Sequence, residues 1–95
     1  MYIVLVNYIK PLDEVDVYLE EHIAFLEKHY AENRFIVSGR RDPRTGGVII
    51  AQVEDEDTIR SIMHEDPFYT NHVAEFEFIK FSPVKYAEAF SPFIV

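Results

Sequence analysis

Residues 2–8 read Tyr-Ile-Val-Leu-Val-Asn-Tyr, and this stretch decides the fold. Its β-branched and aromatic content predicts a strand. Ile3 and Leu5 point to one face of that strand, and the valines that alternate with them point to the other. A strand that is apolar on both faces is normally covered on both faces. The sequence therefore predicts a central strand with a packed layer on each side.

A long helix is expected over residues 12–32, after Lys10-Pro11 has ended the first strand. Apolar residues recur there at helical intervals of four, four, three and four: Val15, Leu19, Ile23, Leu26 and Tyr30. Acids in the first turn suit the helix dipole. Asn33, which tolerates a left-handed conformation, is expected to end the helix.

Shorter elements are expected along the rest of the chain. Two strands are expected at residues 35–39 and 48–54, joined by a turn-rich loop at 40–47, and a short helix follows the acids at 55–57. A fourth strand is expected from residue 74, where Ala74, Phe76 and Phe78 alternate with glutamates. A second short helix is expected around Lys85 to Phe90. The strand at 48–54 is again apolar on both faces.

The element order is βαββαβ, in a chain of 95 residues that is expected to form one domain over 1–95. Its simplest right-handed solution is an α+β, ferredoxin-like fold, an antiparallel sheet with both helices on one face. The two helices leave the other face uncovered, although the central strands are apolar there as well. Such a patch exceeds what monomers normally expose. We therefore expect a homodimer whose sheets pair into a dimeric α/β barrel.

Composition excludes several partners. The net charge is −8, with 9 basic against 17 acidic residues, and phosphate binding requires clustered cations, so we expect no nucleic acid. No apolar run approaches the ~18 residues of a membrane helix, and the first residues show no basic flank and no cleavage site. We therefore expect a cytoplasmic protein away from membranes. Cysteine is absent. His29, His64 and His72 are expected at the surface or an interface, and we expect no metal and no cofactor.

The motif His64-Glu65-Asp66-Pro67-Phe68-Tyr69 carries the chemistry. Proline pushes the preceding residue out of helical geometry, so Asp66 is expected at the tip of the short helix. The topology brings that tip to the middle of the long helix, where His22 lies. An imidazole oriented by a carboxylate can act as a general base. A hydrogen bond that only joins the two helices is the alternative.

Five further residues are candidates for substrate binding. Ser38 ends the second strand and can donate a hydrogen bond. Arg41 and Arg44, in the hairpin loop, can clamp a carboxylate or phenolate, or else be solvated or paired with acids. Asn7 and Tyr8, at the end of the first strand, are second-tier candidates.

From the first strand to residues 81–83, the chain resembles the YciI-like (YCII-related) family. The resemblance is carried by His22 with Phe25-Leu26, Phe-Ile-Val-Ser-Gly at 35–39, Pro-Arg-Thr-Gly-Gly at 43–47 and Asp-Pro-Phe at 66–68. It implies a ferredoxin-like subunit in a dimeric α/β barrel, with His22 and Asp66 in the pocket proposed as the active site. The family includes a dehydrochlorinase of a chlorinated hydroxyquinol. Leu19 stands where many relatives carry Arg, so an anionic substrate would need another cation, such as Arg40, Arg41 or Arg44.

We therefore expect a small cytoplasmic enzyme, lyase-like, that uses a His22–Asp66 dyad on a small cyclic or phenolic molecule. The alternative is a non-catalytic dimeric module that binds a metabolite or a partner protein. A related barrel family contains cofactor-free monooxygenases, which leaves oxidation of a polyphenol open.

Overall fold

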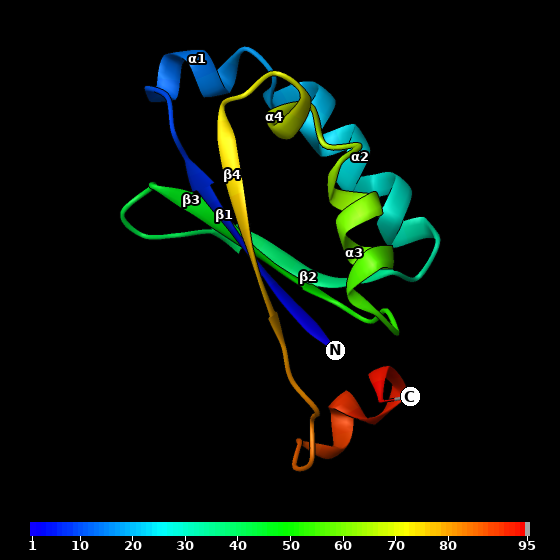
Figure 1. Ribbon diagram of the computed structural model, residues 1–95. Coiled ribbons are helices and arrows are strands. Elements are labelled where there is room, and N and C mark those ends of the chain that lie inside the picture. The colour runs from blue at the N-terminus through cyan, green and yellow to red at the C-terminus, as the bar shows by residue number, and fades with distance from the viewer. Residues whose placement is uncertain (95) are drawn as a thin grey trace.

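The computed structural model describes residues 1–94. Four antiparallel strands form one sheet in the order β2-β3-β1-β4, with bounds β1 Tyr2–Tyr8, β2 Phe35–Arg40, β3 Gly46–Ala51 and β4 Ala74–Lys80. The helices are α1 Leu12–Asp16, α2 Leu19–Ala31, α3 Glu56–Met63, α4 Pro67–Thr70 and the 3-10 helix η1 Glu88–Phe93. Figure 1 shows α2, α3 and α4 on one face of the sheet. The predicted α+β, ferredoxin-like fold is confirmed.

The core lies between this helix layer and the sheet. Tyr2, Val4 and Val6 of β1 are almost fully buried, whereas the residues between them are half-buried. This alternation places the buried set under the helices, as the period of a strand requires. Phe68 of α4 and Val15 of α1 complete the core at the end of the sheet where β1 finishes.

The prediction of one helix over residues 12–32 is wrong, because the chain bends at Val17 and Tyr18 between α1 and α2. Tyr18 has φ −105° and ψ 7°, and its N–H bonds to the carbonyl of Val15 three residues back. Val17 is 70% exposed, so it gains little from a straight helix. Tyr18 packs against the core. Apolar spacing continues across the bend, which is why the pattern does not reveal it.

Other boundaries differ from expectation as well. β3 starts at Gly46 and ends at Ala51, and Pro67 begins the short helix α4 rather than a simple stop. Asn33 has φ 58°, which confirms its predicted left-handed conformation. The tail forms η1 slightly later than predicted, and Val95 lies outside the described residues. Within residues 1–94, no helix has the length and apolar character needed to cross a membrane.

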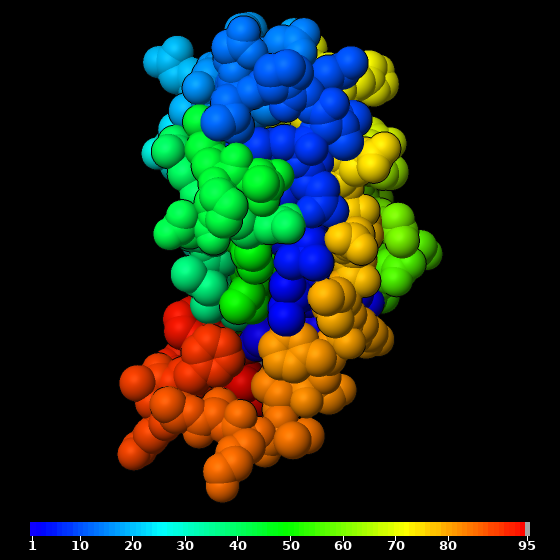
Figure 2. Space-filling model, turned by 90° about the vertical axis from the view of Figure 1, so that its left-hand side faces the viewer, coloured from blue at the N-terminus to red at the C-terminus, as the bar shows by residue number. Residues whose placement is uncertain are grey.

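The sheet face opposite the helices, here called the open face, has no layer over it within residues 1–94 (Figure 2). The strand register aligns Val37, Ile50, Ile3 and Ile79 in one row across all four strands on this face. Leu5 and Val48 pair in the next row. Val37 and Ile79 are 49% and 46% exposed. The open face is therefore apolar across the full width of the sheet.

Candidate functional site

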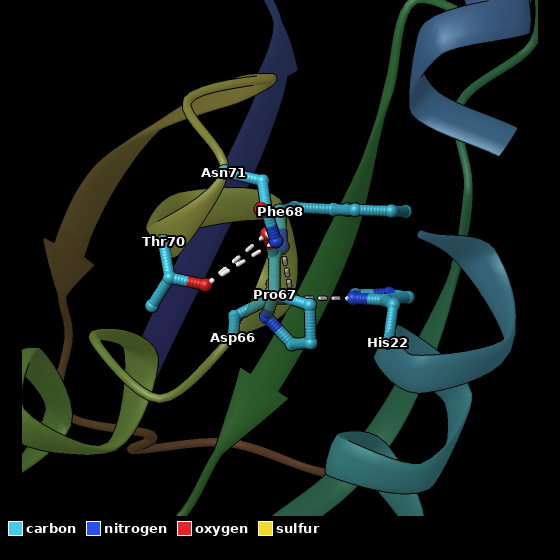
Figure 3. A network of polar contacts seen from close by, with 6 residues as sticks. All are labelled: His22, Asp66, Pro67, Phe68, Thr70 and Asn71. Carbon is cyan, nitrogen blue, oxygen red and sulfur yellow. Dashed lines mark hydrogen bonds and ion pairs between the residues drawn. The ribbon is translucent and has the colours of Figure 1, made fainter. Parts of the chain in front are cut away.

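The imidazole of His22 and the carboxylate of Asp66 meet across the gap between α2 and the connection from α3 to α4. His22 Nδ1 and Asp66 Oδ1 are 2.9 Å apart (Figure 3). Asp66 has extended backbone geometry and caps α4, and Pro67 fills the first helical position. The Phe68 N–H donates to the same oxygen of Asp66 at 3.0 Å. Capping and the contact with His22 thus use one carboxylate oxygen.

This geometry assigns the ring protons of His22. Asp66 is fully buried, and as a carboxylate it can only accept hydrogen bonds. Nδ1 of His22 is then the donor, and Nε2 carries the lone pair of the neutral imidazole. Among residues 1–94, Nε2 of His22 has no hydrogen-bond partner. The second oxygen of Asp66, Oδ2, is buried and likewise accepts no hydrogen bond within the described part of the chain.

Aromatic packing fixes the plane of the imidazole. Figure 3 shows the His22 and Phe68 rings parallel and face to face. Their centroids are 4.0 Å apart and their planes differ by 7°. The Tyr8 ring packs edge-on against the Phe68 ring, with centroids 5.9 Å apart and an interplanar angle of 88°. Because both the hydrogen bond and the stack restrain the ring, Nε2 points in one defined direction.

A cavity of about 190 Å³ lies beside His22, between α2 and the ends of β1, β2 and β3. Its walls are mainly apolar, from Val6, Leu19, Ile23, Leu26, Ile49 and Phe68. The polar side chains in its lining are His22, Tyr8, Ser38 and Arg40. An apolar cavity of about 150 Å³ is large enough to hold benzene. The space therefore fits a molecule with a single ring.

Gly47 helps to make this space. It pairs with Arg40 on one side and with Val6 on the other, in a row that faces the helices. Without a side chain, Gly47 leaves the floor of the cavity open between those two residues. A Cβ added there would lie 3.0 Å from the carbonyl oxygen of Gly39.

Two of the five predicted binding residues line the cavity. Tyr8 is one, and Ser38 is the other, with its hydroxyl 2.7 Å from the hydroxyl of Tyr30. In the sequence, Tyr30 contributes only to the apolar spacing of the long helix. No sequence signal links it to Ser38, because the contact depends on how α2 crosses β2.

The other three predicted binding residues, Asn7, Arg41 and Arg44, are absent from the lining of this cavity. Asn7 belongs to the open face, where it donates to Glu77 and accepts from Arg41. Arg44 binds Asp16 at 2.6 Å, a hydrogen bond that lowers the pKa of Asp16 below its ordinary value and raises that of Arg44. Both arginines thus have partners within the protein.

The sequence predicts His29 at the surface or an interface, but His29 is fully buried within the subunit, so that prediction is wrong. Its Nε2 is 3.0 Å from Oε1 of Glu65, and its Nδ1 accepts from Arg34. Arginine cannot accept a hydrogen bond, so His29 donates from Nε2 to Glu65. Hydrogen bonds from Lys28, and secondly from His29, lower the pKa of Glu65. Neighbouring acids, Glu65 and Asp66, therefore each bind a histidine of α2.

No cluster of three or more potential metal ligands is present among residues 1–94. The structure brings together His22, Asp66, Tyr8 and Ser38 around one cavity.

Three comparisons place the chain among known proteins. The family model of the YCII-related domain matches residues 1–82. No curated protein matches. Among solved structures, 5-chloro-2-hydroxyhydroquinone dehydrochlorinase from Burkholderia phenoliruptrix AC1100, in complex with 2,5-dihydroxybenzoquinone, is similar with a TM-score of 0.71 and 21% sequence identity. The match covers 94% of this chain and 98% of that chain. At this level of identity, the likeness shows the fold.

Proposed function

Because the chain belongs to the YCII-related family, we propose that it is a small enzyme in which His22, oriented by Asp66, acts as a general base on a small cyclic or phenolic molecule. One observation carries the proposal. The His22 imidazole is hydrogen-bonded at Nδ1 to a buried carboxylate and forms part of the wall of an apolar cavity. A base held in this way has a fixed tautomer and a counter-charge for its protonated form.

The proposed step is an elimination. Nε2 of His22 takes a proton from a hydroxyl or an acidic carbon of the substrate. The electron pair left behind forms a new double bond, and the leaving group departs with its own pair. Asp66 stabilises the imidazolium that results, since the two groups then form an ion pair within the protein. A positioned general base contributes about a hundredfold to ten-thousandfold in rate.

Size and lining support a single-ring substrate. Leu19, Ile23 and Leu26 of α2 face the strand residues across the cavity, and the hydroxyls of Tyr8 and Ser38 can orient ring oxygens. The structurally similar dehydrochlorinase binds a dihydroxybenzoquinone. Ring compounds with hydroxyl or keto groups are therefore the first candidates to test.

We also propose that the open face pairs with the open face of a second copy, as in a dimeric α/β barrel. The support is the apolar row of Val37, Ile50, Ile3 and Ile79, which crosses every strand and has no covering layer within residues 1–94. An exposed row of this kind on a small domain is normally an interface.

The experiment that tests the enzymatic proposal is a thermal-shift screen of small phenols, lactones and carboxylates, beginning with 2,5-dihydroxybenzoquinone. Wild type is compared with His22→Ala, and with His64→Ala as a control at an exposed histidine outside the cavity. A ligand that stabilises wild type and the control but not His22→Ala supports the site. Conversion of that ligand by wild type supports catalysis, and binding without conversion supports a non-catalytic module. If every stabilising ligand acts equally on all three proteins, the proposed site is wrong.

A further inference from the structure

We propose that Arg40 forms an anion-binding subsite at the mouth of the cavity, so that the natural ligand carries an oxyanion, a carboxylate or a phenolate, in addition to its ring. This inference rests on the proposed function for the position of the ligand. It adds the chemical class of the ligand and the residue that selects it.

The register of the sheet places Arg40 on the helix-covered side. Arg40 pairs with Gly47, and Gly47 pairs with Val6, which is buried beneath the helices. Side chains on one strand alternate between faces, so Arg40 shares its face with Ser38. Both residues belong to the lining of the cavity. Arg40 is exposed, which locates it at the solvent end of the space.

Among residues 1–94, Arg40 differs from the other two arginines near the hairpin in having no partner. Arg41 donates to Asn7 on the open face, and Arg44 is bound to Asp16. Within residues 1–94, the guanidinium of Arg40 makes no hydrogen bond or ion pair. Arg40 is therefore the one arginine of this group that can bind a ligand without first breaking an internal contact.

The acid near Arg40 is Asp16, at the end of α1. The positive charge of Arg40 contributes to the lowered pKa of Asp16, behind the larger effect of the hydrogen bond from Arg44. Asp16 ends α1, which lies at the end of the sheet where β1 finishes (Figure 1). The cavity is lined by residues from that end of β1. The strand register places Arg40 on the helix side, and the acid near it, Asp16, is paired with Arg44.

The chemistry of this arrangement favours a delocalised anion. A guanidinium presents paired N–H donors that match a carboxylate, and it also binds phenolates. The protein as a whole carries a net charge of −8, which repels anions. A free cation beside a mainly apolar cavity reverses that effect locally. The cavity then combines an apolar slot for a ring with one positive group for its charged substituent.

Binding measurements test this inference without any turnover assay. Three probes share a ring and differ in charge: benzoate, 4-nitrophenolate at alkaline pH, and neutral benzyl alcohol. Affinities are measured by nuclear magnetic resonance titration of wild type, Arg40→Gln and Arg40→Lys. Arg60→Gln is the matched control, because Arg60 lies on α3 away from the cavity and pairs with Glu56.

The expected result is that Arg40→Gln lowers the affinity for one or both anions by about tenfold to a hundredfold. This factor corresponds to the free energy of a hydrogen bond to a charged group. Arg40→Lys should lower these affinities less. The affinity for benzyl alcohol should not change in either variant, and the Arg60→Gln control should bind all three probes as wild type does. A selective loss of affinity for benzoate identifies a carboxylate ligand, and a selective loss of affinity for 4-nitrophenolate identifies a phenolate.

Three results would overturn the inference. They are failure of wild type to bind either anion, equal loss of charged and neutral probes in Arg40→Gln, and unchanged anion affinity in that variant. His22→Ala keeps the anion preference if the subsite exists, even where the proposed base chemistry is wrong. The two proposals can therefore fail separately.

Discussion

The ring of Phe68 lies parallel to the imidazole of His22, with 4.0 Å between centroids, while the backbone N–H of Phe68 donates to Asp66 at 3.0 Å. One residue therefore restrains both members of the proposed dyad. The order Asp-Pro-Phe makes this possible, because Asp66 caps a helix that Pro67 begins, and the next residue is then directed under α2.

Replacing the Phe68 ring should separate positioning from folding. Phe68→Leu keeps the backbone hydrogen bond but removes the stack, and Phe68 is 1% exposed. We expect a loss of about 1–2 kcal/mol in the free energy of unfolding. At a temperature where the variant is folded, kcat should fall more than KM rises, because the imidazole loses its fixed plane. Steady-state kinetics with a substrate from the screen measures both, and an unchanged kcat would show that stacking has no positioning role.

Asp66→Asn tests the charge of the dyad. The side-chain carbonyl of Asn can still accept from His22 and Phe68, but the amide nitrogen replaces Oδ2, which has no partner within the described residues. A buried unsatisfied amide costs about 1–3 kcal/mol. Without the counter-charge, turnover should fall about a hundredfold or more. Unfolding and kinetics are measured together, and a variant that is less stable but equally active would assign Asp66 a structural role alone.

Glu65 should make stability depend on pH in the acid range. Its pKa in the folded protein is lowered, first by Lys28 and then by His29. The folded state thus favours the charged form, so this contribution is present above the ordinary pKa of about 4.3. It is lost as the pH falls through the lowered value. The side chain is 44% exposed, so we expect a small effect.

The measurement for Glu65 is the midpoint of thermal unfolding against pH for wild type and Glu65→Gln. The difference between them should shrink as the pH is lowered. Glu27→Gln is the control, since Glu27 is exposed and forms no ion pair within residues 1–94. A difference that is constant with pH would mean that the ion pair does not stabilise the fold.

Gly46 is required by the close approach of β3 to β1. A Cβ added at Gly46 would lie 1.8 Å from the carbonyl oxygen of Val6. We therefore expect Gly46→Ala to cost about 1–3 kcal/mol or to disrupt this pairing. Gly39→Ala is the matched control, because nothing lies within 4 Å of its added Cβ. Urea unfolding of the two variants measures the difference, and equal midpoints would contradict the close contact.

The proposed dimer is tested at the centre of the open face. Wild type should sediment at micromolar concentration with the mass of two chains. Ile50→Lys places a charge in the apolar row and should shift the mass toward one chain. Val17 lies in the bend between α1 and α2 and is 70% exposed, so Val17→Lys should leave the mass unchanged. A wild-type mass of one chain would contradict the proposal.

Local patterns are sufficient to predict the order of the four strands and the two apolar faces of β1, but not the division into α1 and α2 or the short helix α4. They are insufficient wherever a contact between distant elements decides the outcome. His29 looks like a polar residue near a helix end, and it is buried because the end of α3 presents Glu65 to it. The bend at Tyr18 is hidden because the apolar spacing continues through it.

The candidate site likewise combines features that the sequence predicts with features that depend on contacts between distant elements. His22 and Asp66 were predicted from topology and from proline geometry, and they lie within hydrogen-bond distance. Asn7 and Tyr8 were grouped because both end β1, yet neighbours on a strand face opposite ways, and only Tyr8 reaches the cavity. The loop arginines could not be distinguished from sequence, because their partners Asn7 and Asp16 come from elsewhere in the fold.

The most direct test of the account is the protonation of the His22 ring, observed by nitrogen-15 nuclear magnetic resonance of the imidazoles near neutral pH. His29 serves as the internal comparison, because its Nε2 donates to Glu65. We predict that His22 carries its proton on Nδ1, with a free Nε2 whose signal moves when a ring ligand binds. A His22 protonated on Nε2, with no response to ligand, would contradict this prediction.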